Sequence, residues 1–516
     1  MLLVAGAIAF GVLQLTGAGE PDQADPTAIF EATVEPEPSD DPFAWEPGRQ
    51  EDLERRARAG NSHVLYERSP GGAVASAGRT AEFRRKVNKA ASEHGVSADL
   101  MEAMVLLESA GRPAVIAGGV DPANASGLAQ IVASTGIDLL EMDIDLDESR
   151  RQTDRILRSR AEAARLRARA SRLVKKGGRR NEAKARRLRA AARDADLEVE
   201  LGRRARLRAD PRFDPEAALD GMARYLEIAT ERFGREDLAV TSYHMGIGNL
   251  SDVASSYLPP EQAELALRDV IDQSDLSYAQ LFFDSSPLQH AETWEILGGF
   301  ADDSATYYWR VLAAREIMRL YRKDPDELRR LAELHGNKAT AEEVFHPESE
   351  TRVFDDPGEL EDGIEAGELQ RIPSGRSYGF VVGKELGELT DELGVKRSLY
   401  RQLRPEALAA LVYMAGRVQA ITGKHGPKND LRVTSAARDR EYQAALIPLN
   451  GEATRSYSLH TTGYSFDILR DYANDAQAEA FQFVLDRMKA LNIIDYAREP
   501  QAIHVTVSED ARPLLG

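Results

Sequence analysis

The sequence predicts a multidomain protein in which a mainly α-helical region precedes an α+β region. Its 516 residues are too many for one ordinary hydrophobic core, and 42% of them are hydrophobic, which is ample for several globular cores. From about residue 80, apolar residues recur at helical spacing, whereas beyond Glu348 strand-like runs alternate with helical segments. We therefore expect one domain over residues 80–335 and a second over residues 345–516.

The overall composition excludes several kinds of site. The net charge is −19, which argues against a nucleic-acid-binding protein of the usual basic kind. The chain contains no cysteine, so disulfides, thiolate zinc sites and a cysteine nucleophile are excluded. An exported form of this chain must therefore be held together by its hydrophobic cores alone.

The N-terminal segment is expected to direct the chain to the cell envelope, outside the cytoplasm. Residues 1–19 form a continuous apolar run close to the length of a membrane-spanning helix. We interpret this run as a membrane anchor; the alternative is a cleaved signal, which would make the protein a secreted one. Residues 20–79 are expected to form an acidic, proline-rich linker that is extended by its own charge.

The stretch from Ser97 to Ile131 contains the strongest catalytic candidate. Ser97 is expected to cap a helix, in which Met101 and Val105 precede Glu108 on one face. A carboxyl group on an apolar face must be paired or have its pKa raised, and a raised pKa suits a general acid near neutral pH. The alternative is a solvated glutamate at a helix end.

Three short motifs follow one another along this region. They are Glu108-Ser109, the turn Gly127-Leu128-Ala129-Gln130, and a helical segment that contains Tyr243. In this order they resemble the signatures of the lysozyme-like lytic transglycosylases, and the resemblance covers about residues 80–335. One position departs from the family pattern, because His244 stands where the family has asparagine.

The resemblance implies a mainly helical, lysozyme-like fold and a single catalytic acid/base. Glu108 would cleave the MurNAc–GlcNAc β-1,4 bond of peptidoglycan glycan strands and leave a 1,6-anhydro product. Ser109, Gln130 and Tyr243 would contribute to substrate binding. No cofactor is expected for this step, and no second carboxylate is needed, in contrast to a glycoside hydrolase.

An insertion interrupts this region. Residues 147–209 are almost wholly Arg, Lys, Ala, Glu and Leu, and the pair Gly177-Gly178 lies near the middle. This composition predicts an inserted basic helical hairpin whose two helices are joined at the glycines. The hairpin is either a solvated coiled-coil arm or a surface that contacts anionic wall polymer, the membrane or the glycan cleft.

A second group of candidate residues lies in the C-terminal region. His460 and Asp467 belong to the string Ser-x-His-x-x-Gly-x-x-x-Asp, and His504 lies in a late strand. Two histidines and a carboxylate are ligand types of zinc sites that leave one position open, although in sequence alone they can be unrelated. Upstream, Arg438 ends a Ser-x-x-Arg motif, and Gln443 follows five residues later.

These C-terminal motifs resemble the D-alanyl-D-alanine carboxypeptidases and related M15-type peptidoglycan peptidases. The resemblance covers about residues 345–516 and implies an α+β, zinc-peptidase-like domain directed at stem peptides. Zinc would be held by His460, Asp467 and His504. Arg438 would bind a substrate carboxylate or stabilise the transition state.

One position of this second pattern also departs from the family. Active members carry a water-activating acid three positions before the last histidine, where this chain has Gln501; Glu499 lies two residues further back. Three functions remain open: a lytic transglycosylase with or without a second peptidase activity, a zinc D,D-carboxypeptidase or endopeptidase with a glycan-binding helical domain, and an inactive cell-wall-binding scaffold.

Overall fold

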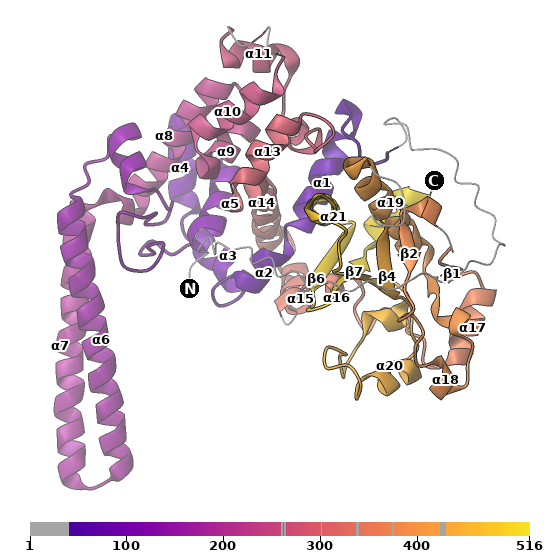
Figure 1. Cartoon of the computed structure of the whole chain (residues 1–516). Coiled ribbons are helices and arrows are strands. Elements are labelled where there is room, and N and C mark those ends of the chain that lie inside the picture. Colours follow the sequence, from indigo (N-terminus) through magenta and orange to yellow (C-terminus); the bar gives the residue numbers. More distant parts are fainter. Residues whose placement is uncertain are drawn as a thin grey trace. The chain divides into compact units, whose positions relative to one another are not determined.

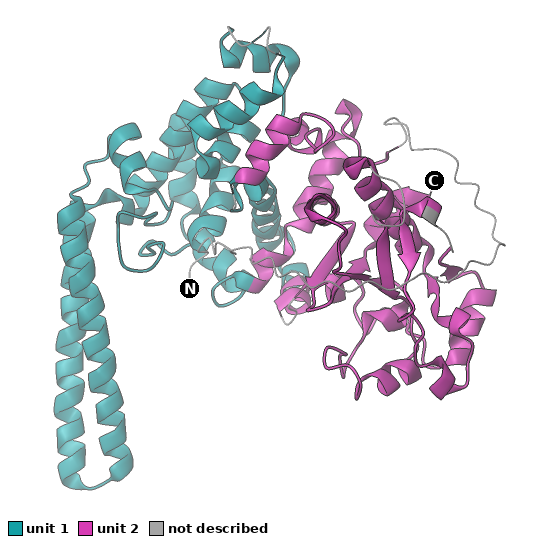
Figure 2. Cartoon of the chain, in the orientation of Figure 1, with its two compact units in different colours: residues 1–7, 68–277, 300–329 teal, residues 8–67, 278–299, 330–516 magenta. Residues whose placement is uncertain are grey.

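The computed structural model describes residues 41–259, 262, 265–300, 302–336, 340–373, 376–423 and 430–515. These residues form two compact units, and each is described by itself (Figure 2). Apart from the gaps just named, unit 1 comprises residues 68–277 and 300–329, and unit 2 comprises residues 41–67, 278–299 and 330–515. The predicted order of a mainly helical region followed by an α+β region is confirmed.

Unit 1 is built from helices around a central one, α5, against which α3, α4 and α14 pack (Figure 1). Met101 and Met104 of α5 are fully buried there, as is Trp309 of α14. The helices are α3 (Ala73–Ala81), α4 (Arg84–His94), α5 (Ala98–Ser109), α6 (Leu146–Lys176), α7 (Arg179–Ala209), α8 (Pro215–Phe233), α9 (Glu236–Met245), α10 (Ile247–Tyr257), α11 (Leu267–Ser274) and α14 (Tyr307–Lys323).

Local sequence signals set the start of α5. Gly95 ends α4 in the left-handed region at φ 67°, and the Ser97 side chain accepts a hydrogen bond from the Leu100 backbone N–H at 3.3 Å. This N-cap satisfies one of the free amides at the helix start. The capping predicted for Ser97 is therefore confirmed.

Helices α6 and α7 pack against each other as a long antiparallel hairpin (Figure 1). Small residues line the seam: Ala163 and Ala170 of α6 and Ala185 and Ala192 of α7 are buried. Gly177 and Gly178, at φ 67° and 90°, form the connection. The helical hairpin expected over residues 147–209 is present.

Unit 2 contains a five-stranded sheet in the order β2-β4-β5-β7-β6 (Figure 1). Strands β2 and β4 are parallel, and the other neighbouring pairs are antiparallel. The strands are β2 (Phe380–Val382), β4 (Leu431–Ser435), β5 (Ser465–Leu469), β6 (Ile494–Arg498) and β7 (Ala502–Val507), and β1 (Gln370–Arg371) pairs separately with β3 (Gln402–Leu403).

The helices of unit 2 include α19 and α21, which pack together and contact the sheet. On β7, Ile503, Val505 and Val507 are buried and alternate with His504 and Thr506, which occupy the other face. The remaining helices are α1 (Gln50–Gly60), α2 (His63–Arg68), α12 (Tyr278–Phe283), α13 (Ala291–Gly299), α16 (Glu342–Phe345), α17 (Pro357–Glu365), α18 (Thr390–Leu393), α19 (Pro405–Thr422), α20 (Arg440–Leu446) and α21 (Asp475–Ala490), and α15 (Pro325–Gly336) crosses the unit boundary.

The linker expected over residues 20–79 is wrong where the structure describes it. Helices α1, α2 and most of α3 occupy this range from residue 50 onward. Leu53 and Ala57 share one face of α1 and are buried, as is Tyr66 of α2, so this segment contributes to a core in spite of its charge. Residues 20–40 lie outside the described part.

Two further expectations concern boundaries and the membrane. Residues 278–299, expected within the first domain, belong to unit 2 together with α1 and α2. The expected anchor at residues 1–19 lies outside the described residues. Among the described residues, no helix combines the length and the apolar character that crossing a bilayer requires.

Candidate functional site

The first candidate site is organised around Glu108 in the last turn of α5. The Tyr307 hydroxyl, at the start of α14, donates a hydrogen bond of 2.6 Å to Glu108 Oε1, and Tyr307 is only 2% exposed. Burial raises the pKa of the Glu108 carboxyl, and the charge of His244 and the Tyr307 hydrogen bond offset part of this rise. The site therefore holds a carboxyl group that keeps its proton to higher pH than a solvated glutamate.

The predicted glycine turn is rigidly built. Gln130 has a positive φ of 51°, and its side-chain amide donates hydrogen bonds to the Gly127 and Val115 carbonyls at 2.8 and 3.3 Å. Gly127 has φ 81°, and a Cβ there would lie 1.7 Å from the Arg212 carbonyl oxygen. Gln130 thus orders the turn, and Gly127 is required by the close backbone approach.

The residues that follow the insertion fix the position of this turn. Arg212 lies just beyond the end of α7 at Ala209, is fully buried, and pairs with buried Asp210 at 2.7 Å. Its guanidinium also donates to the carbonyls of Pro122 and Ile131 at 2.6 and 3.0 Å. The chain leaving the hairpin is therefore held against the turn by a buried ion pair and by several hydrogen bonds.

Tyr243 joins α9 to the same turn. Its hydroxyl donates to the Ala129 carbonyl at 2.7 Å, and its ring meets Tyr225 edge to face at a centroid distance of 5.0 Å. Burial, together with the charge of Glu108, raises the pKa of Tyr243 well above its ordinary value. Tyr243 therefore remains protonated and lies within electrostatic reach of Glu108.

His244 supplies a second titratable group beside Glu108. Its ring stacks on Tyr307 at 5.1 Å with an interplanar angle of 6°, and its Nε2 lies 3.1 Å from Asp303 Oδ1. Burial alone would lower the pKa of His244, but the Asp303 bond and the Glu108 charge raise it. Asp303 also pairs with Arg310, and the His244 and Arg310 partners hold the pKa of Asp303 at about 2 in spite of its burial.

The structure brings some of the predicted residues of this site together but not all of them. It brings Glu108, Gln130 and Tyr243 together through the turn and the local charges described above. Ser109 is fully buried, and its hydroxyl donates to the Val105 carbonyl of α5, which leaves no surface for the expected substrate contact. Tyr307 was not among the predicted site residues; in the sequence it stands in the aromatic run Tyr307-Tyr308-Trp309, which resembles the closing helix of the transglycosylase family, but this run does not show that its hydroxyl reaches Glu108.

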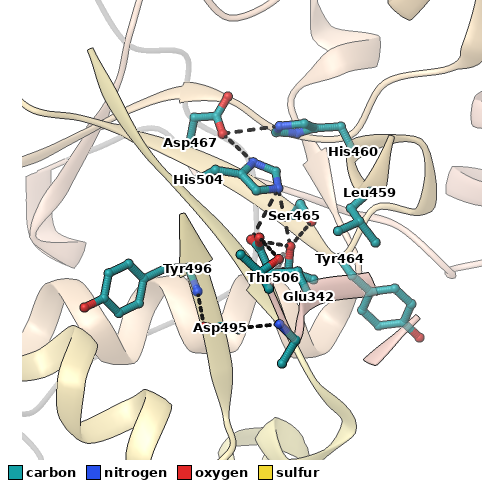
Figure 3. A network of polar contacts seen from close by, with 12 residues as sticks. Glu342, Leu459, His460, Tyr464, Ser465, Asp467, Asp495, Tyr496, His504 and Thr506 are labelled. Atoms are coloured by element: carbon teal, nitrogen blue, oxygen red, sulfur yellow. Dashed lines mark hydrogen bonds and ion pairs between the residues drawn. The ribbon is translucent and has the colours of Figure 1, made fainter. Parts of the chain in front are cut away.

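The second candidate site lies on the sheet of unit 2, where Asp467 of β5 faces His504 of β7 in register (Figure 3). His504 Nδ1 lies 2.8 Å from Asp467 Oδ1, and His460 Nε2 lies 3.2 Å from the same oxygen. The three ligand atoms all lie within 4.8 Å of one another. The predicted ligand set therefore converges on one point.

The hydrogen bonds of the two histidines leave the converging nitrogens available for a metal. His460 Nδ1 bonds to the Ala436 carbonyl at 2.9 Å, so its other nitrogen, Nε2, faces Asp467. Burial lowers the pKa of His460 to about 4, which favours the neutral, ligating form. On the other side of His504, Nε2 lies 3.5 Å from Glu342 Oε1 and 3.4 Å from the Thr506 hydroxyl.

Glu342 was not identified from the sequence. It lies on the short helix α16, is buried, and accepts a hydrogen bond from the Thr506 hydroxyl at 3.1 Å (Figure 3). Burial and Asp495 raise the pKa of Glu342, whereas His504 lowers it, with a net rise. A carboxylate behind a histidine is the usual partner that orients a metal ligand.

These residues fit a zinc ion by donor type and spacing. Tetrahedral zinc with bonds of about 2.0–2.2 Å separates neighbouring ligands by roughly 3.3 Å, close to the 2.8 and 3.2 Å between the Asp467 oxygen and the two histidine nitrogens. Three protein ligands leave a fourth position for substrate. Arg438 adjoins the cluster, because its Nη2 lies 3.6 Å from Asp467 Oδ2 and its Nη1 donates to Gln443 at 3.0 Å.

The β6–β7 turn distinguishes Glu499 from Gln501. Ala497 pairs with His504, and the Glu499 N–H bonds to the Ala502 carbonyl, so the register puts Glu499 on the His504 face. Burial raises the pKa of Glu499, and so does the nearby charge of Asp467. Gln501 is an exposed amide. Glu499, with its carboxyl group on the His504 face, is therefore the better candidate for activating a water molecule.

Comparisons of the chain with protein-family models, characterised proteins and solved structures found no match. The assignment of function accordingly depends on the two groups of residues and on their geometry.

Proposed function

We propose that the chain is a peptidoglycan lytic transglycosylase with a lysozyme-like catalytic domain and Glu108 as its acid/base. The observation that carries this proposal is the Glu108 carboxyl itself: it is half-buried at the end of a buried helix, the buried Tyr307 hydroxyl fixes it, and its pKa is raised by burial. The ordered Gly127–Gln130 turn and Tyr243 support the proposal, because they occur in family order and are joined by a hydrogen bond.

In the proposed reaction, Glu108 first donates its proton to the glycosidic oxygen as the bond to the MurNAc anomeric carbon breaks. The resulting carboxylate then takes the proton of the C6 hydroxyl, whose oxygen closes on the anomeric carbon. The proton returns to Glu108, no water is consumed, and the product is a 1,6-anhydro sugar. A single carboxyl with a raised pKa can perform both steps.

The test is digestion of purified peptidoglycan sacculi by the full chain in the presence of a metal chelator. Mass spectrometry should find 1,6-anhydro muropeptides with the unaltered protein and none with Glu108→Gln. Glu93→Gln, an exposed residue of α4, is the matched control and should remain active. Reducing-end MurNAc in place of the anhydro product, or product from Glu108→Gln, would refute the proposal.

A second function is favoured by the converging ligands in unit 2: we propose a zinc-dependent, stem-peptide-directed activity there. Bound zinc would supply Lewis acidity at the scissile carbonyl. His460, Asp467 and His504 would hold the ion, and Arg438 would bind the carboxylate of the peptide. Glu499 would accept the proton of the attacking water, which an amide at position 501 cannot do.

Zinc content after dialysis and release of D-alanine from a stem pentapeptide test this second function. His460→Ala should lose zinc, whereas Glu499→Gln should retain zinc and lose D-alanine release. Gln501→Ala should behave as the unaltered protein, because this side chain is exposed. Zinc binding without peptide cleavage by any variant would leave a binding domain, and the absence of both activities would support the scaffold alternative.

A further inference from the structure

The distal half of the α6–α7 hairpin, residues 158–193, carries an unusual charge. Fifteen of its 36 residues are arginine or lysine, and two, Glu162 and Glu182, are acidic, which gives a net charge of +13. Because the whole chain carries −19, the rest of the chain carries −32. A polyanion would therefore be repelled by most of this protein and attracted to this segment.

The cations of this distal half are largely unpaired. Arg169, Arg172 and Arg187 are exposed, and among the described residues none of them lies within ion-pair distance of a carboxylate. At the base of the same hairpin the pattern is the opposite. There Arg150 pairs with Asp121 at 2.9 Å, and Arg155 pairs with Glu198 at 2.6 Å. The hairpin can thus neutralise its arginines where it has acidic neighbours, and its outer half has almost none.

The distribution of charge favours a flexible partner. With Ala163 and Ala170 turned into the seam, the cations of α6 spread around its whole outward side, and those of α7 do the same. A lipid surface would touch one side of the hairpin only. Insertion into the lipid would also need an apolar face, yet within residues 158–193 Val174 is the one large apolar side chain that is exposed. A straight nucleic-acid duplex would also contact one side only, and bending 20–30 base pairs of it around the hairpin would cost about 1–6 kcal/mol.

We infer that residues 158–193 bind a flexible phosphodiester polymer of the cell wall, of the poly(glycerol phosphate) type. The unpaired arginines suit a phosphodiester, since guanidinium groups form bidentate pairs with phosphate oxygens. That the polymer comes from the wall rests on the proposed function. The hairpin would then hold the enzyme on its substrate layer without taking part in bond cleavage.

The test is a binding titration of the full chain with defined poly(glycerol phosphate), read by calorimetry at 50 and 200 mM salt. Contact with about eight phosphates predicts a loss of affinity of about 10³-fold between the two salt concentrations. The triple variant Arg169→Gln, Arg172→Gln, Arg187→Gln should bind about 100-fold more weakly at low salt, at roughly fivefold per charge. Glutamine keeps the helices, because its helix propensity is close to that of arginine.

A matched control removes the same number of charges from the base of the hairpin: Arg150→Gln, Arg151→Gln, Arg155→Gln. This variant should bind within threefold of the unaltered protein. Equal weakening by both triple variants, no weakening by the distal one, or tighter arm-dependent binding to anionic vesicles or duplex DNA would overturn the inference. Glu108→Gln protein should bind the polymer normally, so failure of the transglycosylase proposal remains distinguishable from failure of this one.

Discussion

Gly127→Ala should disable the first site without touching any catalytic group. The added Cβ would lie 1.7 Å from the Arg212 carbonyl oxygen, whereas ordinary contact begins at 3.4 Å, so one of the two backbones must move by about 1.7 Å. Arg212 resists this movement because its side chain is buried and bonded to Asp210, Pro122 and Ile131. The turn that carries Gln130 must therefore yield.

The expected cost is large for activity and moderate for stability. Misplacement of about 1 Å in a catalytic arrangement can cost about 10²-fold in rate, so we expect at least that loss of anhydro-muropeptide release. The positive φ of 81° adds about 1–2 kcal/mol of backbone strain for alanine. The assay is the initial rate of anhydro product release from sacculi, with thermal unfolding of the same samples.

Gly119→Ala is the matched control for this experiment. Gly119 also has a positive φ, 88°, but nothing lies within 4 Å of an added Cβ. It should incur the backbone strain alone and retain most of its activity. If Gly127→Ala keeps more than a third of the rate, or if both variants lose activity equally, the close approach to Arg212 does not position this site.

Three further predictions address single residues. Glu342→Ala should weaken zinc binding 10- to 100-fold with partial rescue in Glu342→Gln, measured by competition with a chelating dye; unchanged affinity would mean that this carboxylate does not orient His504. His244→Asn removes a charge that lowers the pKa of Glu108, so the alkaline limb of the kcat/KM profile should move to higher pH. An unchanged alkaline limb would mean that His244 does not influence the ionisation of Glu108. Because burial raises the pKa of Glu108, its ionisation costs stability as pH rises through that pKa. Glu108→Gln should therefore raise Tm at neutral pH and leave it unchanged well below 4.5, the ordinary value; an equal rise at both pH values would point to packing instead.

The sequence predicted those parts of the two sites that are encoded locally. Glu108 was singled out by its position on an apolar helix face together with the resemblance of the three motifs to the lytic transglycosylases, and the turn at Gly127 was part of that resemblance. The Asp467–His504 pair needed a strand register, which alternation alone does not fix between distant segments. Its confirmation as a cluster comes from the antiparallel pairing of β5 and β7.

The partners that orient these groups could not be predicted, because they come from far along the chain. Tyr307 lies 199 residues from Glu108, and its hydroxyl reaches the carboxyl only because α14 packs on α5. Glu342 comes from a four-residue helix that has no periodic signal of its own. The helices between residues 50 and 68 were missed for a related reason: their charged composition concealed Leu53 and Ala57, which become buried only when unit 2 is assembled.

The two candidate sites share no residue, and each draws its groups from one unit, so the two proposed activities should be separable. Chelation should remove D-alanine release and leave anhydro products, because none of the three proposed metal ligands belongs to the unit that contains Glu108. Glu108→Gln should have the opposite effect, since the ligands of unit 2 keep all their hydrogen bonds. Loss of both activities on chelation would require zinc to stabilise the helical unit as well, and the Glu108–Tyr307 and Tyr243–Ala129 hydrogen bonds, which hold the first site together, involve no zinc-ligating side chain.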